Sequence, residues 1–155
     1  GCVSDLLRRG RALHMTLALG WPLQEAVFAA LTADPSVQAL AAGRIYDAVP
    51  PASGEAEVIS VYAVIGDDTV QEWGTGTDAG SQHLFGISIF AAERSFAQAK
   101  ALAGAIGDVM VTAPLPLSRG RVVCVSFFSA RTRREERDRL RRIDLRFRVL
   151  IEDTA

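Results

Sequence analysis

Five residues whose side chains could bind a metal ion or carry protons lie close together near the middle of the sequence. They are Asp67, Asp68, Glu72, Asp78 and His83. Their spacing does not match the calcium-binding loop, and zinc prefers sulfur and nitrogen donors at short intervals. The sequence therefore predicts a solvated acidic segment here and no metal site.

Three glycines in the same segment, Gly74, Gly76 and Gly80, are spaced as in some phosphate-binding loops. Such a loop must lead into a helix whose amino end faces the phosphate, and the P-loop also requires Gly-Lys-Ser/Thr. Here a strand-like sequence follows, and Gly-Lys-Ser/Thr does not occur. We therefore predict a mobile loop over residues 73–82 and no nucleotide or other cofactor.

Signatures of nucleophilic or acid–base catalysis are missing. The sequence Gly-x-Ser-x-Gly does not occur, and neither Cys2 nor Cys124 has an obvious activating partner. Glu55 and Glu57 form a carboxylate pair, but most globular chains contain such pairs. We predict no catalytic residue, and a small enzyme of unrecognised type is kept as a rival hypothesis.

Arginine dominates the C-terminal part of the chain. Residues 119–148 hold eleven arginines and four acidic residues, which gives +7, whereas residues 1–118 hold six basic and twelve acidic residues, which gives −6. Such segregation suits identical subunits that dock a positive side onto a negative one. It also suits non-specific contact with nucleic-acid phosphates, although aromatic residues for base stacking are not interleaved. Both hypotheses stay open, beside a merely solvated surface.

Periodicity predicts two main helices. The first begins at Pro22, which suits a first helical turn, and Asp34-Pro35 interrupts it before a short helical piece that ends at Gly43. Ser95 is the expected N-cap of the second. The apolar stripe of this second helix consists of Phe96, Ala99, Leu102, Ala103, Ile106 and Met110.

Strands account for most of the remaining sequence. We expect a brief extended segment within residues 44–51, a covered strand within 57–68, another over 83–93, and two long strands within 120–153 joined near residues 135–138. The strands are mostly joined as hairpins. The fold class is therefore predicted to be α+β, with an antiparallel or mixed sheet and two main helices packed on one face.

The segment RRIDLRFRVLIED, residues 141–153, shows the clearest alternation. One row contains Ile143, Leu145, Phe147, Val149 and Ile151, and the other contains Arg142, Asp144, Arg146, Arg148, Leu150 and Glu152. Successive side chains of a strand point to opposite faces, so we expect the first row in the core and the second in water.

Length and composition indicate one soluble domain. The chain has 155 residues and a hydrophobic fraction of 49%, and no apolar run approaches the ~20 residues needed to cross a bilayer. We expect folding in the cytoplasm, no membrane partner, an N-terminal extension over residues 1–21 and a single domain over residues 22–155. Met15 is a plausible alternative start.

Four stretches carry a resemblance to a known family. They are PLQEAVFAALTADPSVQALAAGRIYDAVPP (22–51), HLFGISIFAAERSFAQAKALAGAIGDVM (83–110), LPLSRGRVVCVSFFSARTRRE (115–135) and RRIDLRFRVLIED (141–153). Together they resemble the tail completion, or tail terminator, proteins of long-tailed phages, in particular the versions in alphaproteobacterial gene transfer agents. The likeness covers roughly residues 22–153. It rests on the order and character of the segments, without a catalytic signature.

The resemblance implies a structural protein. Such proteins form a six-membered ring on the head-proximal end of a tail tube, stop its growth and join the head connector. The implied partners are further copies of the chain, the tail tube protein, the head–tail connector and, transiently, DNA in the channel. The implied location is the cytoplasm during assembly and then the top of the tail in a virion or gene transfer agent particle. A non-specific DNA-binding module built on the arginine-rich hairpin is the alternative.

A subunit or partner interface is expected on this hypothesis, with opposite charges on its two sides and Trp73 as an aromatic anchor. The acidic side would use Asp67, Asp68, Glu72 and Asp78, and the basic side Arg133, Arg134, Arg137, Arg139 and Arg141.

Overall fold

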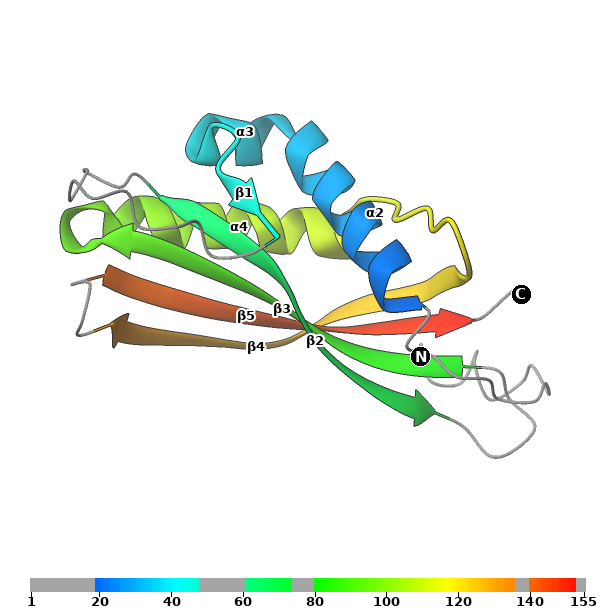
Figure 1. The fold of residues 1–155 in the computed structure, drawn as a ribbon. Helices are drawn as coiled ribbons and strands as arrows, with labels where there is room; N and C mark the ends of the chain where they lie inside the picture. Colours follow the sequence, from blue (N-terminus) through cyan, green and yellow to red (C-terminus); the bar gives the residue numbers. More distant parts are fainter. Residues whose placement is uncertain (1–18, 48–60, 74–79, 136–139, 153–155) are drawn as a thin grey trace.

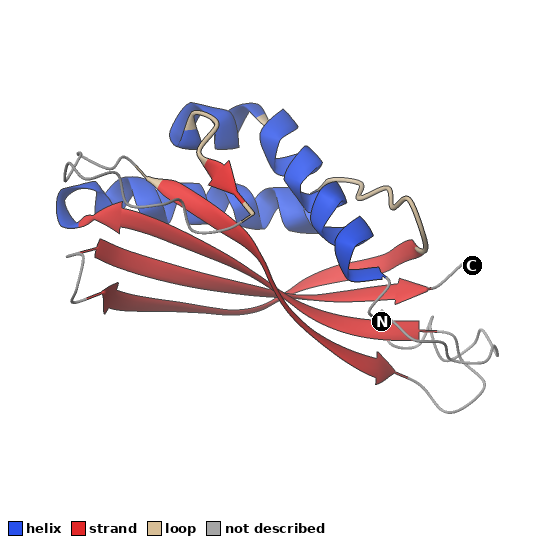
Figure 2. Ribbon diagram, viewed as in Figure 1, coloured by secondary structure: helices blue, strands red, loops and turns tan. Residues whose placement is uncertain are grey.

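The chain folds as two layers. The structure is a computed structural model, and it describes residues 19–47, 61–73, 80–135 and 140–152. One layer is a five-stranded mixed sheet, and the helices all lie on one face of it (Figures 1 and 2). The predicted α+β class with helices on one face is confirmed.

The helical layer contains three α-helices. α2 begins two residues before the predicted start at Pro22, and the break at Asp34-Pro35 is confirmed. Asp34 caps α3, because its Oδ2 accepts a hydrogen bond from the backbone N–H of Val37 at 3.0 Å. None of the described helices is long and apolar enough to cross a membrane. The bounds are Gly20–Ala33 for α2, Pro35–Ala41 for α3 and Phe96–Thr112 for α4.

The expected cap at Ser95 is wrong. Its side chain makes no capping hydrogen bond, because a short 3-10 helix, η2 (Glu93–Ser95), already starts the turn. The backbone N–H of Phe96 donates to the carbonyl of Glu93. α4 therefore continues an existing turn, and its apolar stripe packs into the core as predicted.

The strand order of the sheet is β1-β2-β3-β5-β4. β1 pairs with β2 in parallel, and the other neighbours are antiparallel. β1 covers only Ala63 and Val64 of β2, and β4 forms the opposite edge of the described sheet. The bounds are Ile45–Tyr46 for β1, Tyr62–Trp73 for β2, Gly80–Ala92 for β3, Arg121–Glu135 for β4 and Leu140–Glu152 for β5.

The predicted loop over residues 73–82 is too long. Trp73 belongs to β2 and pairs with Gly80, while Ser81 and Gln82 belong to β3. Ser81 and Gln82 are also paired on their other side with β5, where Ser81 lies opposite Ile151 and Gln82 opposite Leu150. Pairing on both sides of β3 outweighs the weak strand preference of the glycine-rich sequence. The part of the loop between the strands, residues 74–79, lies outside the described residues.

β5 confirms the predicted apolar row and corrects the polar one. The apolar row is at most 4% exposed, as expected for an interior strand facing the helices. In the polar row Arg142 and Asp144 are only half-exposed, and Leu150 and Glu152 are buried. The reason is that β3 and β4 flank this strand, so long side chains from both neighbours cover it.

A bulge at Gly66 changes which side chains of β2 face the helices. The register shifts between Ile65 and Asp67, and Gly66 has a φ of +112°. A Cβ atom at Gly66 would lie 2.6 Å from Oε1 of Gln24, so the end of this side chain from α2 lies against the backbone here. Beyond the bulge Asp68 pairs with the core residue Phe85 and faces inward.

Candidate interaction surfaces

The basic hairpin of β4 and β5 is organised around one carboxylate, Asp144. Its Oδ1 accepts hydrogen bonds from Ser88 Oγ at 2.7 Å and from Arg142 Nε at 2.7 Å. Its Oδ2 accepts from Nε and Nη2 of Arg133 at 3.0 and 2.7 Å. These contacts lie on the face of the sheet that carries no helices, and they neutralise part of the arginine row within the subunit.

This network also sets the ionisation of Asp144. Burial by itself raises the pKa of the carboxyl group, but the hydrogen bond from Ser88 and the pairing with Arg142 and Arg133 lower it by more. The pKa therefore lies below the ordinary value of 3.8, and Asp144 is ionised at neutral pH.

On the helix side, Arg141 fastens the hairpin to the start of α4. Its Nη1 donates to Oε1 of Glu93 at 2.9 Å, and its guanidinium carbon lies 3.9 Å from the ring centre of Phe96. Arg134 lies 3.6 Å from the same Glu93 oxygen but is 73% exposed. Of the three predicted basic residues that the structure describes, Arg133 and Arg141 are thus engaged inside the subunit and Arg134 is the most accessible. Arg137 and Arg139 lie outside the described residues.

Three further arginines lie together on the helix-free face and were not among the predicted site residues. Arg131 is opposite Asp144 in the strand register, and Arg146 and Arg148 follow along β5. Within the described part of the chain, no carboxylate pairs with any of the three. The Arg148 guanidinium lies 5.1 Å from the ring centre of Phe128, which is 46% exposed. We call Phe128, Arg131, Arg146 and Arg148 the arginine–aromatic patch.

The predicted acidic residues belong mainly to β2, on the other side of the sheet. Asp67, Glu72 and Trp73 are strand residues whose side chains are not among the described ones, and Asp78 lies outside the described residues. The strand order separates this acidic strand from the arginine-rich β4 by β3 and β5. The acidic sequence of β2 and the arginine-rich sequence of β4 therefore belong to strands on opposite sides of the sheet.

Asp68 differs from the other predicted acids because it points into the protein. Its Oδ2 lies 2.9 Å from Nδ1 of His83, and Nε2 of His83 lies 3.1 Å from Oγ of Ser81. A carboxylate can only accept, so Nδ1 carries a proton and donates to Asp68. Ser81 then donates to Nε2 when His83 is neutral. This order of contacts is that of a serine hydrolase triad.

Burial argues against catalysis by this trio. Ser81 and His83 are fully buried, so the serine oxygen cannot reach a substrate in this conformation. The trio instead connects β2 to β3 beneath the start of α2, where Gly20 lies near Asp68. Alternation along β2 could not reveal it, because the bulge at Gly66 turns Asp68 inward. Among the described residues, no group of three His, Cys, Asp or Glu side chains is placed to hold a metal ion.

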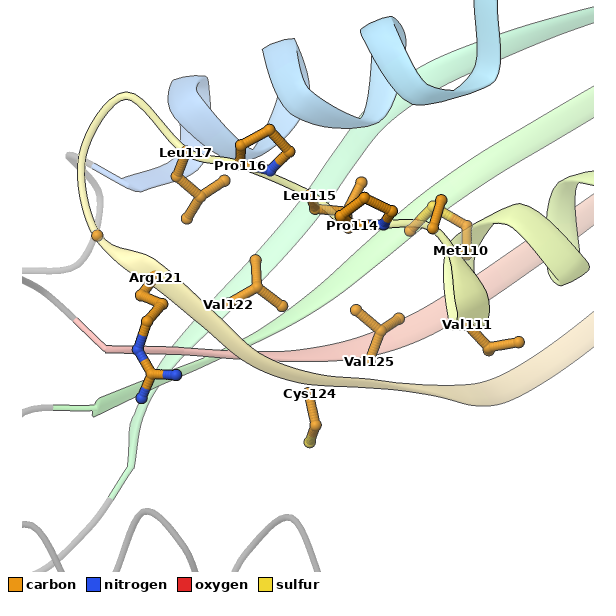
Figure 3. A pocket seen from close by; sticks show the side chains of 12 residues that line it. Met110, Val111, Pro114, Leu115, Pro116, Leu117, Arg121, Val122, Cys124 and Val125 are labelled. Atoms are coloured by element: carbon orange, nitrogen blue, oxygen red, sulfur yellow. The ribbon is translucent and has the colours of Figure 1, made fainter. Parts of the chain in front are cut away.

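A shallow apolar groove runs between the α4–β4 connection and β4. Figure 3 shows Val122 and Val125 pointing from β4 toward Leu115 and Leu117, while Arg121 points away. The groove has a volume of about 560 Å³. Its wall along β4 belongs to an edge strand of the described sheet.

Exposed aromatic residues form a stripe on α2. Trp21 is 60% exposed and Phe28 is 38% exposed. Glu25, also exposed, lies between them, so the three residues follow the i, i+4, i+7 spacing of one helix face. We call Trp21, Glu25 and Phe28 the α2 stripe. Exposed apolar residues of this size are typical of protein–protein contact surfaces.

The α2 stripe and the arginine–aromatic patch are surfaces of the kind through which proteins contact one another, as is typical of small assembly proteins. The chain belongs to the family described as tail completion protein gp17, whose model matches residues 25–152. This is a structural family that is not known for enzymatic activity.

A solved structure supports the same assignment. A chain of the "Virion of native gene transfer agent (GTA) particle" is 41% identical to this chain. The match covers 87% of this chain and 98% of that chain, with a TM-score of 0.76. No curated protein matches the sequence. The resemblance noted in the sequence is confirmed.

Proposed function

We propose that this chain completes the tail of a phage-like gene transfer agent particle. By analogy with the family, six copies of it form a ring on the head-proximal end of the tail tube. The ring joins the tube to the head connector. Family membership and the 41% identity to a chain of a gene transfer agent virion support the particle context.

The proposal of a ring rests on the separation of charge within the sheet. A closed ring needs a heterologous contact, in which one side of each subunit meets a different side of its neighbour. The acidic strand β2 and the arginine-rich strand β4 lie on opposite sides of the sheet. The basic side of one copy can therefore face the acidic side of the next. The interface would use Asp67, Glu72 and Asp78 against Arg133, Arg134, Arg137, Arg139 and Arg141, whereas Asp68 is turned inward to His83.

Exposure narrows the choice of residues for a test. Arg134 is 73% exposed, whereas Arg141 is 19% exposed and bonded to Glu93. Replacing Arg134 and Arg137 together by glutamate should weaken ring assembly and make it more sensitive to salt. Arg94→Glu, at an exposed arginine outside the hairpin, is the matched control.

Assembly is measured by sedimentation velocity over a range of salt concentrations, and tube capping by electron microscopy of purified tails mixed with the protein. Loss of the ring in the double variant, with normal assembly of Arg94→Glu, supports the electrostatic contact. An unchanged ring mass at every salt concentration excludes it. Wild-type protein that never attaches to tube ends refutes the capping function itself.

Trp73 enters the same proposal as an anchor on the tube or the connector. It is the last residue of β2, next to the segment 74–79. Trp73→Ala should leave the ring intact and reduce its attachment to tubes. Loss of the ring itself would place Trp73 between subunits instead.

DNA binding through the hairpin is the second candidate. It is favoured by the exposed arginines on β4 and β5, which extend onto the helix-free face. Salt-dependent retention of duplex DNA by the unassembled wild-type chain would support it. Retention that is equally weak for wild type and for the Arg134→Glu/Arg137→Glu variant would exclude it.

A further inference from the structure

We infer that the arginine–aromatic patch of one copy binds the α2 stripe of a second copy. This inference rests on the proposed self-assembly and adds a contact that the charge pattern of the sequence did not indicate. The patch consists of Phe128, Arg131, Arg146 and Arg148, and the stripe consists of Trp21, Glu25 and Phe28.

The arginines of the patch lack an anionic partner within the described part of the subunit. Asp144, the nearest carboxylate in the strand register, already accepts hydrogen bonds from Ser88, Arg142 and Arg133. Nε of Arg148 is buried and has no hydrogen-bond partner among the described residues. An unpaired charged donor is unfavourable, so a carboxylate brought by a partner would stabilise this guanidinium group.

The α2 stripe offers the complementary chemistry. Glu25 is an exposed carboxylate flanked by two exposed aromatic rings, one a turn before it and one a turn after it. Aromatic rings attract guanidinium groups, and Arg148 already stacks on Phe128 in this way. The α2 stripe, a carboxylate between two aromatic rings, is therefore complementary to the arginine–aromatic patch, in which arginines surround one aromatic ring.

One subunit cannot make this contact with itself. α2 packs against β1 and β2 on the helix-covered face, whereas the patch lies on β4 and β5 on the opposite face (Figure 1). The contact must therefore join two copies, and it is heterologous because different surfaces meet.

Protein recognition fits the patch better than DNA does. A patch of three arginines around one exposed aromatic has the composition of an interface centre, in which tryptophan, tyrosine and arginine are enriched. Binding along a nucleic acid would need a longer basic track for successive phosphates. DNA binding is kept as an outcome of the test.

The test uses two single variants of the full chain and their mixture. Arg146→Glu damages the patch and leaves the stripe intact, and Trp21→Glu damages the stripe and leaves the patch intact. Both residues are exposed, so the fold should survive, which circular dichroism and thermal unfolding verify. Arg94→Glu is the charge-matched control.

Sedimentation velocity should show self-association weakened at least about tenfold in each single variant and unchanged in Arg94→Glu. A one-to-one mixture should form heterodimers, because the intact stripe of Arg146→Glu meets the intact patch of Trp21→Glu. Combining Glu25→Arg with Arg146→Glu in one chain should recover association that each change alone reduces.

The inference is overturned if both variants associate like the wild type, if the mixture stays monomeric, or if the wild type never self-associates at high concentration. It is also overturned if Arg146→Glu reduces only the retention of duplex DNA. If the variants assemble normally and still cap tubes, the contact is refuted and the proposed function is not. If the variants lose association as expected but the wild type never attaches to tubes, the proposed function is refuted and the contact is not.

Discussion

Arg142 and Asp144 lie two residues apart on the helix-free face of β5, and Nε of Arg142 donates to Oδ1 of Asp144 at 2.7 Å. Arg142 also lies 5.1 Å from the ring centre of Phe90, measured from its guanidinium carbon. The charged row of this strand is therefore partly an internal network that holds β3, β5 and β4 in register. Only the arginines beyond it, Arg146 and Arg148, are left for a partner.

Asp144→Asn should destabilise the fold at neutral pH by about 1–3 kcal/mol, because the charge-assisted hydrogen bonds from Ser88, Arg142 and Arg133 weaken. The pKa of Asp144 is lower in the folded chain than its ordinary value of 3.8. The unfolded chain therefore takes up the proton first as the pH falls. The stabilisation is complete well above pH 3.8 and is lost as the pH falls through the folded pKa.

Denaturant unfolding of wild type and Asp144→Asn between neutral pH and about pH 3 measures this effect. The difference in unfolding free energy should narrow below the ordinary pKa of 3.8. A difference that stays constant over the whole range would mean that the carboxylate charge contributes nothing.

Arg141→Met should destabilise the protein more than Arg134→Met. Arg141 loses its bond to Glu93 and its stacking on Phe96, which together are worth about 1–3 kcal/mol. Arg134 is 73% exposed and its distance to Glu93 is 3.6 Å, so its replacement should change stability by less than about 0.5 kcal/mol. Thermal unfolding compares the two. Equal losses would show that Arg141 is not specifically fastening the hairpin to α4.

The predictable parts of this fold are those in which local pattern and tertiary position agree. β5 is an interior strand with the helices on one side, so strict alternation correctly predicts the buried row from Ile143 to Ile151. α4 packs a helical stripe on the same sheet, and its residues were also predicted correctly. In both elements one face is buried along the whole length.

The features that could not be predicted depend on small departures from ideal geometry. The bulge at Gly66 exchanges the two faces of β2, so Asp68, expected at the surface, meets His83 in the interior. The expected cap at Ser95 failed because η2 begins the turn earlier. The arginine–aromatic patch depends on which arginines Asp144 already satisfies, and that requires the strand register.

The two helix starts provide a direct comparison of capping. Asp34→Ala should cost about 1 kcal/mol, because Asp34 accepts the Val37 N–H at 3.0 Å. Ser95→Ala should cost less than about 0.5 kcal/mol, since Ser95 makes no capping bond. Chemical denaturation of the two variants measures the difference. A larger loss for Ser95→Ala would mean that its hydroxyl caps α4 in solution.

A prediction about the buried trio distinguishes a structural role of these residues from a catalytic one. Ser81→Ala should destabilise the fold by about 1–3 kcal/mol, because the fully buried Nε2 of His83 is left without its partner at 3.1 Å. A fluorophosphonate probe, which reacts with activated serines, should not label the folded wild type, because Ser81 is inaccessible. The matched control is Ser126→Ala, at a half-buried serine on β4 outside the trio, which should be nearly neutral. Labelling that disappears in Ser81→Ala would instead show that the trio opens and acts as a nucleophilic site, and the structural interpretation would then be wrong.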